Sequence, residues 1–320
     1  MSGHSRRDFL QIASALAASL GLGRGAAEAL AEGLEKIGTR QKRVIWLQGM
    51  SCTGCSVSFL NTTDPGPLEV LTQVISLTMH SNVSAAQGAQ VLETIEKVTK
   101  EGNYYLILEG AVAPQMPHSC MIGGQTFLTV LDSTLSKAEY VIANGSCAAY
   151  GGIPAAEGNP TGAMGLIDYM KSKGMQIEKR LVNCPGCPTH PSTLVTVLAH
   201  LAGKGYPKVD PNLFTPDMIC KHSVHDECPK FHFWQKERFA ENFGDEGCLF
   251  KLGCLGALSH TNCPQRQWNG GVNWCIRGGA PCIACTGEGF ARKRSFAFYR
   301  KGEQYHAVAY KEQDRKGVAS

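Results

Sequence analysis

Between residues 43 and 203, short apolar runs alternate with segments whose apolar residues recur at helical spacing. The apolar runs predict strands at 43–48, 104–109, 139–144 and 177–183. The helical spacing predicts helices at 88–101, 125–137, 161–173 and 191–203. Such alternation is typical of an α/β fold with a doubly wound parallel sheet, in which helices cover both faces.

The alternation fades after about residue 205, where Pro, Gly, His, Trp and Cys become frequent. Irregular backbone forms few laddered hydrogen bonds, so we expect bound groups to stabilise this second region. After Tyr299 a basic, mostly polar tail runs to Ser320 and is either a solvated end or a docking strap.

The first 31 residues resemble a twin-arginine export signal. Arg6 and Arg7 precede a short apolar stretch at 12–23, and Ala29-Leu30-Ala31 offers a cleavage site. The alternative is a cytosolic amphipathic helix that contains Arg-Arg. The twin-arginine route exports folded proteins, which suits a chain that receives its cofactors first. We therefore expect a periplasmic protein, and the rest of the sequence predicts no transmembrane helix.

Composition narrows the class of protein. The 320 residues are 43% hydrophobic and 18% charged, which fits a folded chain with room for two domains. A net charge of +4 does not indicate nucleic-acid binding, which needs a concentrated basic face. Fourteen cysteines in a chain that can bury its own core favour metal or cluster ligation. A disulfide-bonded secreted protein is the alternative.

Several cysteines follow predicted strands. Cys52 and Cys55 come after the first strand, Cys147 after the third, and Cys184 and Cys187 after the fourth. Since the carboxyl ends of parallel strands meet at one edge of a sheet, we expect these thiols to converge. Four converging thiolates form a closed site for zinc or for an iron–sulfur cluster.

The sequence motifs around these cysteines continue along most of the chain. They are Trp46 to Ser56, Glu109 to Ala111, Gly145 to Gly152, Asn159 to Gly162, Pro185 to Pro188, His225 to Pro229, Leu252 to Cys254 and Pro281 to Cys285. In this order they resemble the small, iron–sulfur subunit of nickel–iron hydrogenases. The resemblance implies a flavodoxin-like domain at 43–203 and an irregular cluster-binding domain at 204–299. The basic tail then covers residues 300–320.

The resemblance also implies three iron–sulfur clusters, each with its own ligands. The proximal set, for a 4Fe–4S cluster, is Cys52, Cys55, Cys147 and Cys187. The medial set is Cys263, Cys275, Cys282 and Cys285. The distal set, for another 4Fe–4S cluster, is His225, Cys228, Cys248 and Cys254. Many family members have proline in place of Cys275 and a medial 3Fe–4S cluster. The fourth thiol here predicts a medial 4Fe–4S cluster, as in the selenium-containing branch, with 3Fe–4S as the alternative.

Some positions allow a second interpretation. A neutral imidazole at His225 suits an exit cluster, although a lone histidine is often only solvated. Cys120, Cys184 and Cys220 are interpreted as small apolar residues, but Cys184 could replace Cys187 as a ligand. We interpret Glu109 as a carboxylate bonded to backbone amides rather than as a proton relay.

Oxygen-tolerant members have two extra cysteines around the proximal cluster. This chain has Gly54 and Gly152 at the matching positions. The resemblance therefore implies an ordinary proximal cluster with four thiolates.

The resemblance implies the electron-transfer subunit of a periplasmic hydrogenase, which oxidises H2 reversibly. The nickel–iron site would lie in a separate large subunit, because this chain lacks the paired C-x-x-C ligands for nickel. Electrons would pass to a periplasmic cytochrome c or to a membrane-bound module. The alternatives are a zinc-stapled structural module and a related complex that uses another carrier.

Overall fold

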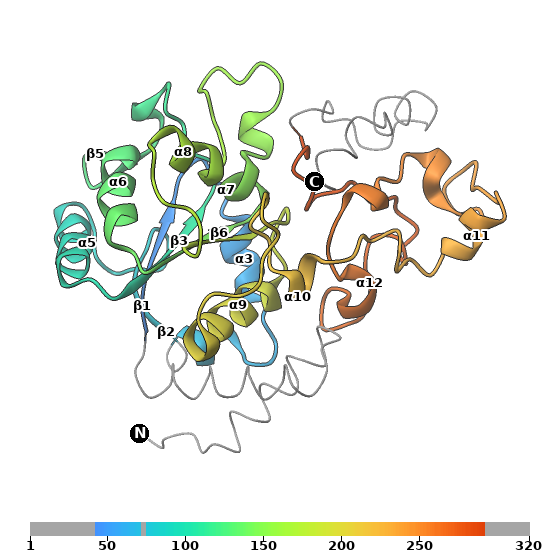
Figure 1. The fold of residues 1–320 in the computed structure, drawn as a ribbon, viewed down its shortest axis with the longest axis horizontal. Coiled ribbons are helices and arrows are strands. Elements are labelled where there is room, and N and C mark those ends of the chain that lie inside the picture. The colour runs from blue at the N-terminus through green and yellow to red at the C-terminus, as the bar shows by residue number, and fades with distance from the viewer. Residues whose placement is uncertain (1–41, 72–74, 292–320) are drawn as a thin grey trace.

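A computed structural model describes residues 42–71 and 75–291. Its central sheet contains five strands, β1 (Lys42–Gln48), β2 (Ile75–His80), β3 (Tyr104–Glu109), β6 (Tyr140–Asn144) and β7 (Leu181–Cys184). The strands run parallel in the order β2-β1-β3-β6-β7. This is the strand order of flavodoxin-like sheets, so the predicted fold class is confirmed (Figure 1).

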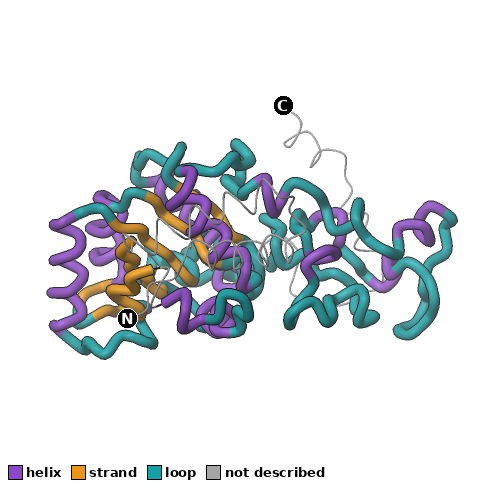
Figure 2. Tube along the Cα trace, turned by 90° about the horizontal axis from the view of Figure 1, so that it is seen from below, coloured by secondary structure: helices purple, strands orange, loops and turns teal. Residues whose placement is uncertain are grey.

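Helices cover both faces of this sheet, as Figure 2 shows. Ile45 and Leu47 of β1 face α5 (Ala89–Glu101), α6 (Phe127–Lys137) and α8 (Leu166–Ser172). The intervening Val44 and Trp46 face α3 (Gly54–Leu60) and α9 (Pro191–Lys204). Both sets are buried, which explains why the strand sequence is a continuous apolar run.

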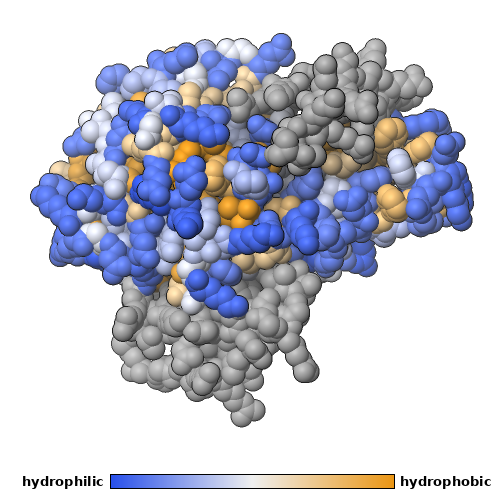
Figure 3. Space-filling view, viewed as in Figure 1, coloured by the Kyte–Doolittle hydropathy of each residue, from blue (hydrophilic) through white to orange (hydrophobic). Residues whose placement is uncertain are grey.

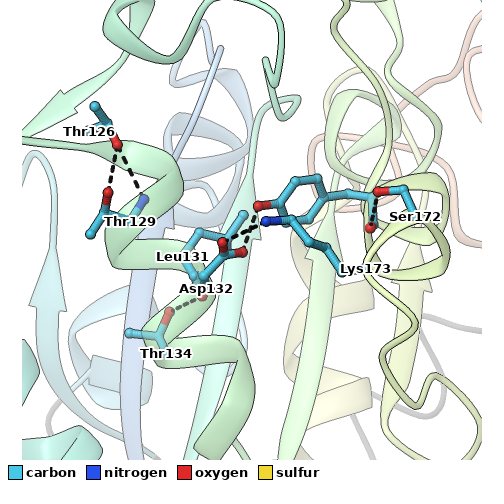
Figure 4. Close-up of polar contacts among 8 residues, drawn as sticks. Thr126, Thr129, Leu131, Asp132, Thr134, Ser172 and Lys173 are labelled. Atoms are coloured by element: carbon cyan, nitrogen blue, oxygen red, sulfur yellow. Dashed lines mark hydrogen bonds and ion pairs between the residues drawn. The ribbon is translucent and has the colours of Figure 1, made fainter.

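Polar contacts join two of these helices on one face (Figure 4). Asp132 of α6 accepts hydrogen bonds from the Tyr169 hydroxyl of α8 at 2.6 Å and from Lys173 Nζ at 2.9 Å. Thr126 caps the start of α6, because its hydroxyl accepts the backbone N–H of Thr129. These contacts join α6 to the C-terminal end of α8 and stabilise the start of α6.

Two predicted elements begin later than expected. Strand β7 starts at Leu181 rather than at 177, because Lys179 adopts a positive φ of 59° in a turn. Helix α8 starts at Leu166 rather than at 161, because Gly162 has a φ of +61° and Met164 pairs with Val112. The predicted helices at 88–101, 125–137 and 191–203 form with shifts of a residue or two at their ends.

Three of the described strands were not predicted. The edge strand β2 is only partly buried, so its sequence lacks a continuous apolar run. The two-residue strands β4 (Met121–Ile122) and β5 (Gln125–Thr126) form a small hairpin before α6. Strands this short leave no periodic signal in a sequence.

The region after residue 205 consists mainly of loops, as predicted (Figure 2). Its described helices are the short α10 (Asp217–Cys220), α11 (Phe231–Gln235) and α12 (Cys263–Arg266) with the 3-10 turns η4 (Leu249–Leu252) and η5 (Gly256–Leu258). The other short helical elements of the chain are α4 (Pro67–Glu69), α7 (Ser146–Tyr150), η2 (Pro117–Ser119) and η3 (Ile153–Ala155).

The predicted signal at 1–31 and the tail at 300–320 lie outside the described residues. Among the helices that are described, none has the length and apolar character needed to cross a bilayer.

Candidate metal centres

The four thiols of the proximal set meet at the carboxyl edge of the sheet. Cys52 lies in the loop after β1, Cys55 in α3, Cys147 in α7 after β6, and Cys187 after β7. Burial raises the pKa of Cys147 to about 11, and the nearby thiols of Cys187 and Cys52 contribute to the increase. Burial also raises the pKa of Cys55, with contributions from Glu109 and Cys147. Cys147 therefore has Cys52, Cys55 and Cys187 as neighbours, which is the grouping that the prediction requires.

Glycines let the backbone approach these thiols closely. Gly145 has a φ of +101°, and a Cβ there would lie 2.5 Å from Cys55 Sγ. A Cβ on Gly152, at a φ of +49°, would lie 2.9 Å from Cys147 Sγ. A side chain at either position would displace a thiol. The backbone thus forms a close cradle around sulfur donors, which fits a cluster held by four cysteines.

The structure separates Cys184 from Cys187. Cys184 is the last residue of β7, is fully buried and packs in the apolar cluster on the α3 and α9 face. Cys187 lies three residues farther on, and burial followed by the Cys52 thiol raises its pKa. Cys184 also lies near Cys55, so each of the two thiols has one proximal cysteine as a neighbour. Cys187 remains the predicted ligand, because Cys184 is buried in the apolar cluster.

Glu109 anchors the loop that carries Cys52 and Cys55. The carboxylate is only 2% exposed. Its Oε1 accepts the backbone N–H of Cys55 and the hydroxyl of Ser51, each at 3.1 Å. Its Oε2 accepts Trp46 Nε1 at 3.2 Å and the hydroxyl of Ser56. The backbone contact matches the prediction, while the side-chain donors were not foreseen.

The medial set comes from three turns of the second region. Cys263 opens α12, Cys275 lies in the loop after it, and Cys282 and Cys285 lie in one short segment. Burial raises the pKa of Cys285 to about 12, with contributions from Cys263 and Cys275. Burial, followed by the thiols of Cys254, Cys285 and Cys263, also raises the pKa of Cys282. Cys275 is thus a neighbour of the Cys263 and Cys285 thiols.

Three cysteines of the distal set are neighbours as well. Burial raises the pKa of Cys254 to about 11, and the thiols of Cys228 and Cys248 contribute to the increase. His225 lies beside them, because its carbonyl accepts the backbone N–H of Cys228 at 3.2 Å. A Cβ on Gly256 would lie 3.6 Å from both Cys254 Sγ and the His225 backbone nitrogen.

The imidazole of His225 is enclosed by aromatic rings. The ring centroids of Phe231 and Trp234 lie 5.1 and 5.0 Å from it, both edge-on. Burial lowers the pKa of His225, while Asp226 opposes the change. Lowering the pKa favours the neutral form, which is the form that binds metals.

Direct contacts connect the three sets in sequence. The Ser146 hydroxyl, next to Cys147, donates to the Cys285 carbonyl, and the Cys187 thiol contributes to the raised pKa of Cys285. On the other side, the backbone N–H of Leu255 donates to the Cys282 carbonyl at 2.7 Å. The medial set therefore lies between the proximal and the distal sets.

Sequence reasoning missed residues that support the donor sets. Ser146 also accepts the backbone N–H of Gly186 at 2.9 Å, so it joins three loops. The Thr189 hydroxyl lies 3.9 Å from Cys55 Sγ. Arg266 lies three residues after Cys263 in α12, and its Nη2 lies 3.9 Å from Cys263 Sγ. The one sequence signal for Arg266 was its spacing of three residues from Cys263, since this spacing places two side chains on the same face of a helix.

No disulfide joins any of the fourteen cysteines, all of which lie within the described residues. Within the described residues, no group of three or more His, Cys, Asp or Glu side chains is arranged to hold a single metal ion.

Comparison with known families assigns both parts of the chain. Residues 52–201 match the family described as NADH ubiquinone oxidoreductase, 20 Kd subunit. Residues 220–298 match the family described as the C-terminal part of the NiFe/NiFeSe hydrogenase small subunit.

Characterised relatives resemble the chain over most of its length. The periplasmic [NiFeSe] hydrogenase small subunit of Desulfomicrobium baculatum is 36% identical over 91% of this chain and 97% of its own. The periplasmic [NiFe] hydrogenase small subunit 1 of Nitratidesulfovibrio vulgaris is 35% identical over 92% of both chains.

Solved structures show the same fold. A chain of the [NiFeSe] hydrogenase from Desulfomicrobium baculatum superimposes with a TM-score of 0.74 at 35% identity, covering 82% of this chain and 99% of that chain. A chain of the [NiFeSe] hydrogenase from Desulfovibrio vulgaris Hildenborough gives a TM-score of 0.76 at 35% identity, covering 81% and 98%.

Proposed function

The chain belongs to the small-subunit family of nickel–iron and nickel–iron–selenium hydrogenases, and we propose that it conducts electrons through three iron–sulfur clusters. It is thus part of an oxidoreductase that acts on H2. The observation that carries the proposal is the arrangement of three donor sets in one series. Cys187 lies near Cys285, and Cys254 near Cys282.

Each donor set would hold one cluster. The proximal set would bind a 4Fe–4S cluster, since four thiols meet in the glycine cradle at the sheet edge. The medial set would bind a second 4Fe–4S cluster, because Cys275 completes four thiols. The distal set would bind the third through His225 and three thiols. When bound, such clusters supply one-electron transfer, with potentials tuned by charge, hydrogen bonds and exposure.

The chain's own residues hold the ligand loops in place. Glu109 fixes the loop of Cys52 and Cys55, and Ser146 joins the proximal loops to Cys285. The apolar packing of Phe231 and Trp234 around His225 restricts water on one side of that ring. In the folded protein these contacts hold the donors in place, which limits structural change during electron transfer.

A large subunit that carries the nickel–iron site would bind to form a heterodimer. The face shown in Figure 3 is mostly hydrophilic, but apolar side chains reach the surface near its middle. Val57 and Leu60 of α3 and Ile153 after α7 are among the exposed apolar side chains, 55%, 49% and 43% exposed. They lie close in sequence to the proximal cysteines, where electrons would enter from the large subunit.

The proposed location is the periplasm, reached by twin-arginine export. The relatives from Desulfomicrobium baculatum and Nitratidesulfovibrio vulgaris are named as periplasmic hydrogenase small subunits. The first 31 residues of this chain resemble a twin-arginine export signal. A periplasmic cytochrome c, or a membrane-bound electron-accepting module, would then receive electrons from the distal cluster.

The test compares two activities of the anaerobically purified heterodimer. Isotope exchange between D2 gas and the protons of water needs only the nickel–iron site. Reduction of cytochrome c by H2 needs all three clusters. We expect His225→Ala to slow cytochrome reduction at least 10-fold and to leave exchange nearly unchanged. Cys120→Ser is the control, since Cys120 lies outside the three sets, and it should change neither rate. Equal losses in both activities of His225→Ala would contradict an exit role for this residue.

A further inference from the structure

Arg266 is a buried cation that has no carboxylate partner among the described residues. Its side chain is only 6% exposed. An arginine side chain keeps its charge at any pH at which a protein folds. Such a charge is costly to bury unless another group compensates it. In the described part of the chain, none of the ion pairs includes Arg266, and its Nε has no hydrogen-bond partner.

The groups that surround the guanidinium are neutral hydroxyls and thiols. Nη1 donates to the Thr193 hydroxyl, and Nη2 donates to the Thr261 hydroxyl at 3.1 Å. Nη2 also lies 3.9 Å from the sulfur of Cys263. Burial raises the pKa of Cys220 to about 12, and the positive charge of Arg266 opposes this rise.

His190 cannot supply the missing negative charge. Its imidazole packs edge-on against Trp268, with ring centroids 4.7 Å apart. Burial, followed by the positive charge of Arg266, lowers the pKa of His190 to about 2. The imidazole is therefore neutral near pH 7, and the thiol of Cys263 is the closest group that becomes anionic when it ligates iron.

We propose that Arg266 is the built-in counter-charge of the medial donor set and raises the reduction potential of the cluster held there. The inference rests on the proposed function and goes beyond it by assigning a positioning residue. Adding an electron increases the negative charge of the thiolate-bound site, and a buried cation beside Cys263 stabilises that added charge. Arg266 thereby offsets the lower potential that a fourth thiolate, Cys275, imposes.

The experiment is a redox titration of the medial signal by electron paramagnetic resonance, using the full heterodimer. Arg266→Gln removes the charge and keeps a polar side chain, so we expect a lower midpoint potential for the medial cluster. The proximal and distal clusters should shift less. Arg266→Lys keeps the charge and should keep the potential close to that of the wild type.

Arg277→Gln is the matched control, because Arg277 is an exposed cation two residues from Cys275. Water screens an exposed charge, so its removal should shift the medial potential less than Arg266→Gln does. An intact medial cluster with an unchanged potential in Arg266→Gln would overturn the proposal. An equal shift in Arg277→Gln would also overturn it, since burial would then not matter.

A variant that loses its medial cluster still gives an answer. If Arg266→Gln binds no medial iron but Arg266→Lys retains the wild-type potential, the charge is what the site requires and the proposal holds. If both variants lose medial iron, the guanidinium acts through its hydrogen bonds and the proposal fails. A wild-type heterodimer without a medial iron–sulfur signal would instead refute the proposed function itself.

Discussion

The sheet region and the region after residue 205 carry similar donor sets, but the donors are placed differently relative to the hydrophobic core. In the sheet region, apolar clusters on both faces of the sheet form the core, and the proximal thiols sit on loops at its edge. In the second region, Cys282 is itself part of a small core with Trp274, Ile276 and Leu249. Cys228, Cys254 and Cys263 pack against that core.

The difference shows that cysteine donors of the same kind can lie outside the core of one region and form part of the core of another. The sheet has buried strands, laddered hydrogen bonds and two apolar layers that need no metal. The second region has short helices and isolated bridges around its sulfur atoms. Its stability should therefore depend on the bound clusters, whereas the stability of the sheet should not.

Removal of iron should produce the largest effect and separate the two regions. After anaerobic chelation, amides between residues 205 and 291 should lose most of their protection from hydrogen exchange. Amides of β1, β3 and β6 should keep most of theirs, because their apolar burial is unchanged. Hydrogen-exchange mass spectrometry checks this. Equal loss of protection in both regions would mean that the sheet also depends on its cluster.

The next largest effect concerns the edge of the sheet. Cys187→Ser should abolish the proximal signal in electron paramagnetic resonance while the sheet remains folded, since this thiol lies outside the core. Cys184→Ser is the matched control. It should keep the proximal cluster but cost about 1–3 kcal/mol of unfolding free energy, because it places a hydroxyl in the apolar cluster. The reverse pattern would identify Cys184 as the ligand.

A smaller, local effect is expected within the second region. Cys275→Pro removes one of four medial thiols and should convert a 4Fe–4S signal into a three-iron signal. Protection from hydrogen exchange in the sheet should not change, because Cys275 is exposed and lies outside both sheet clusters. Electron paramagnetic resonance of the oxidised heterodimer measures the conversion. An unchanged medial spectrum would show that Cys275 is not a ligand.

The two regions also differ in how well their structure can be predicted from the sequence. Strand β3 was predicted to the residue, because all six of its residues are buried and the five that precede Glu109 form a continuous apolar run. Strand β2 was missed because it lies at the sheet edge and is half-buried. The start of β7 was misplaced because the turn at Lys179 carries no glycine or proline to mark it.

Hydrophobic periodicity could not predict the placement of donors after residue 205. Irregular backbone has no periodicity from which one could predict that Cys228 and Cys248 are neighbours. Their grouping was implied only by the order of motifs that the chain shares with a family. Arg266 was missed for a related reason. Its burial depends on Thr193 of α9, which is far away in the sequence. Contacts of this kind become visible only in three dimensions.

The central claim is that three separate donor sets hold iron–sulfur clusters. Mössbauer spectroscopy of the anaerobically purified, iron-57-labelled heterodimer, combined with metal analysis, tests it most directly. We predict about twelve cluster iron atoms per small subunit, in three four-iron centres. A colourless small subunit with stoichiometric zinc and no cluster iron would contradict the account.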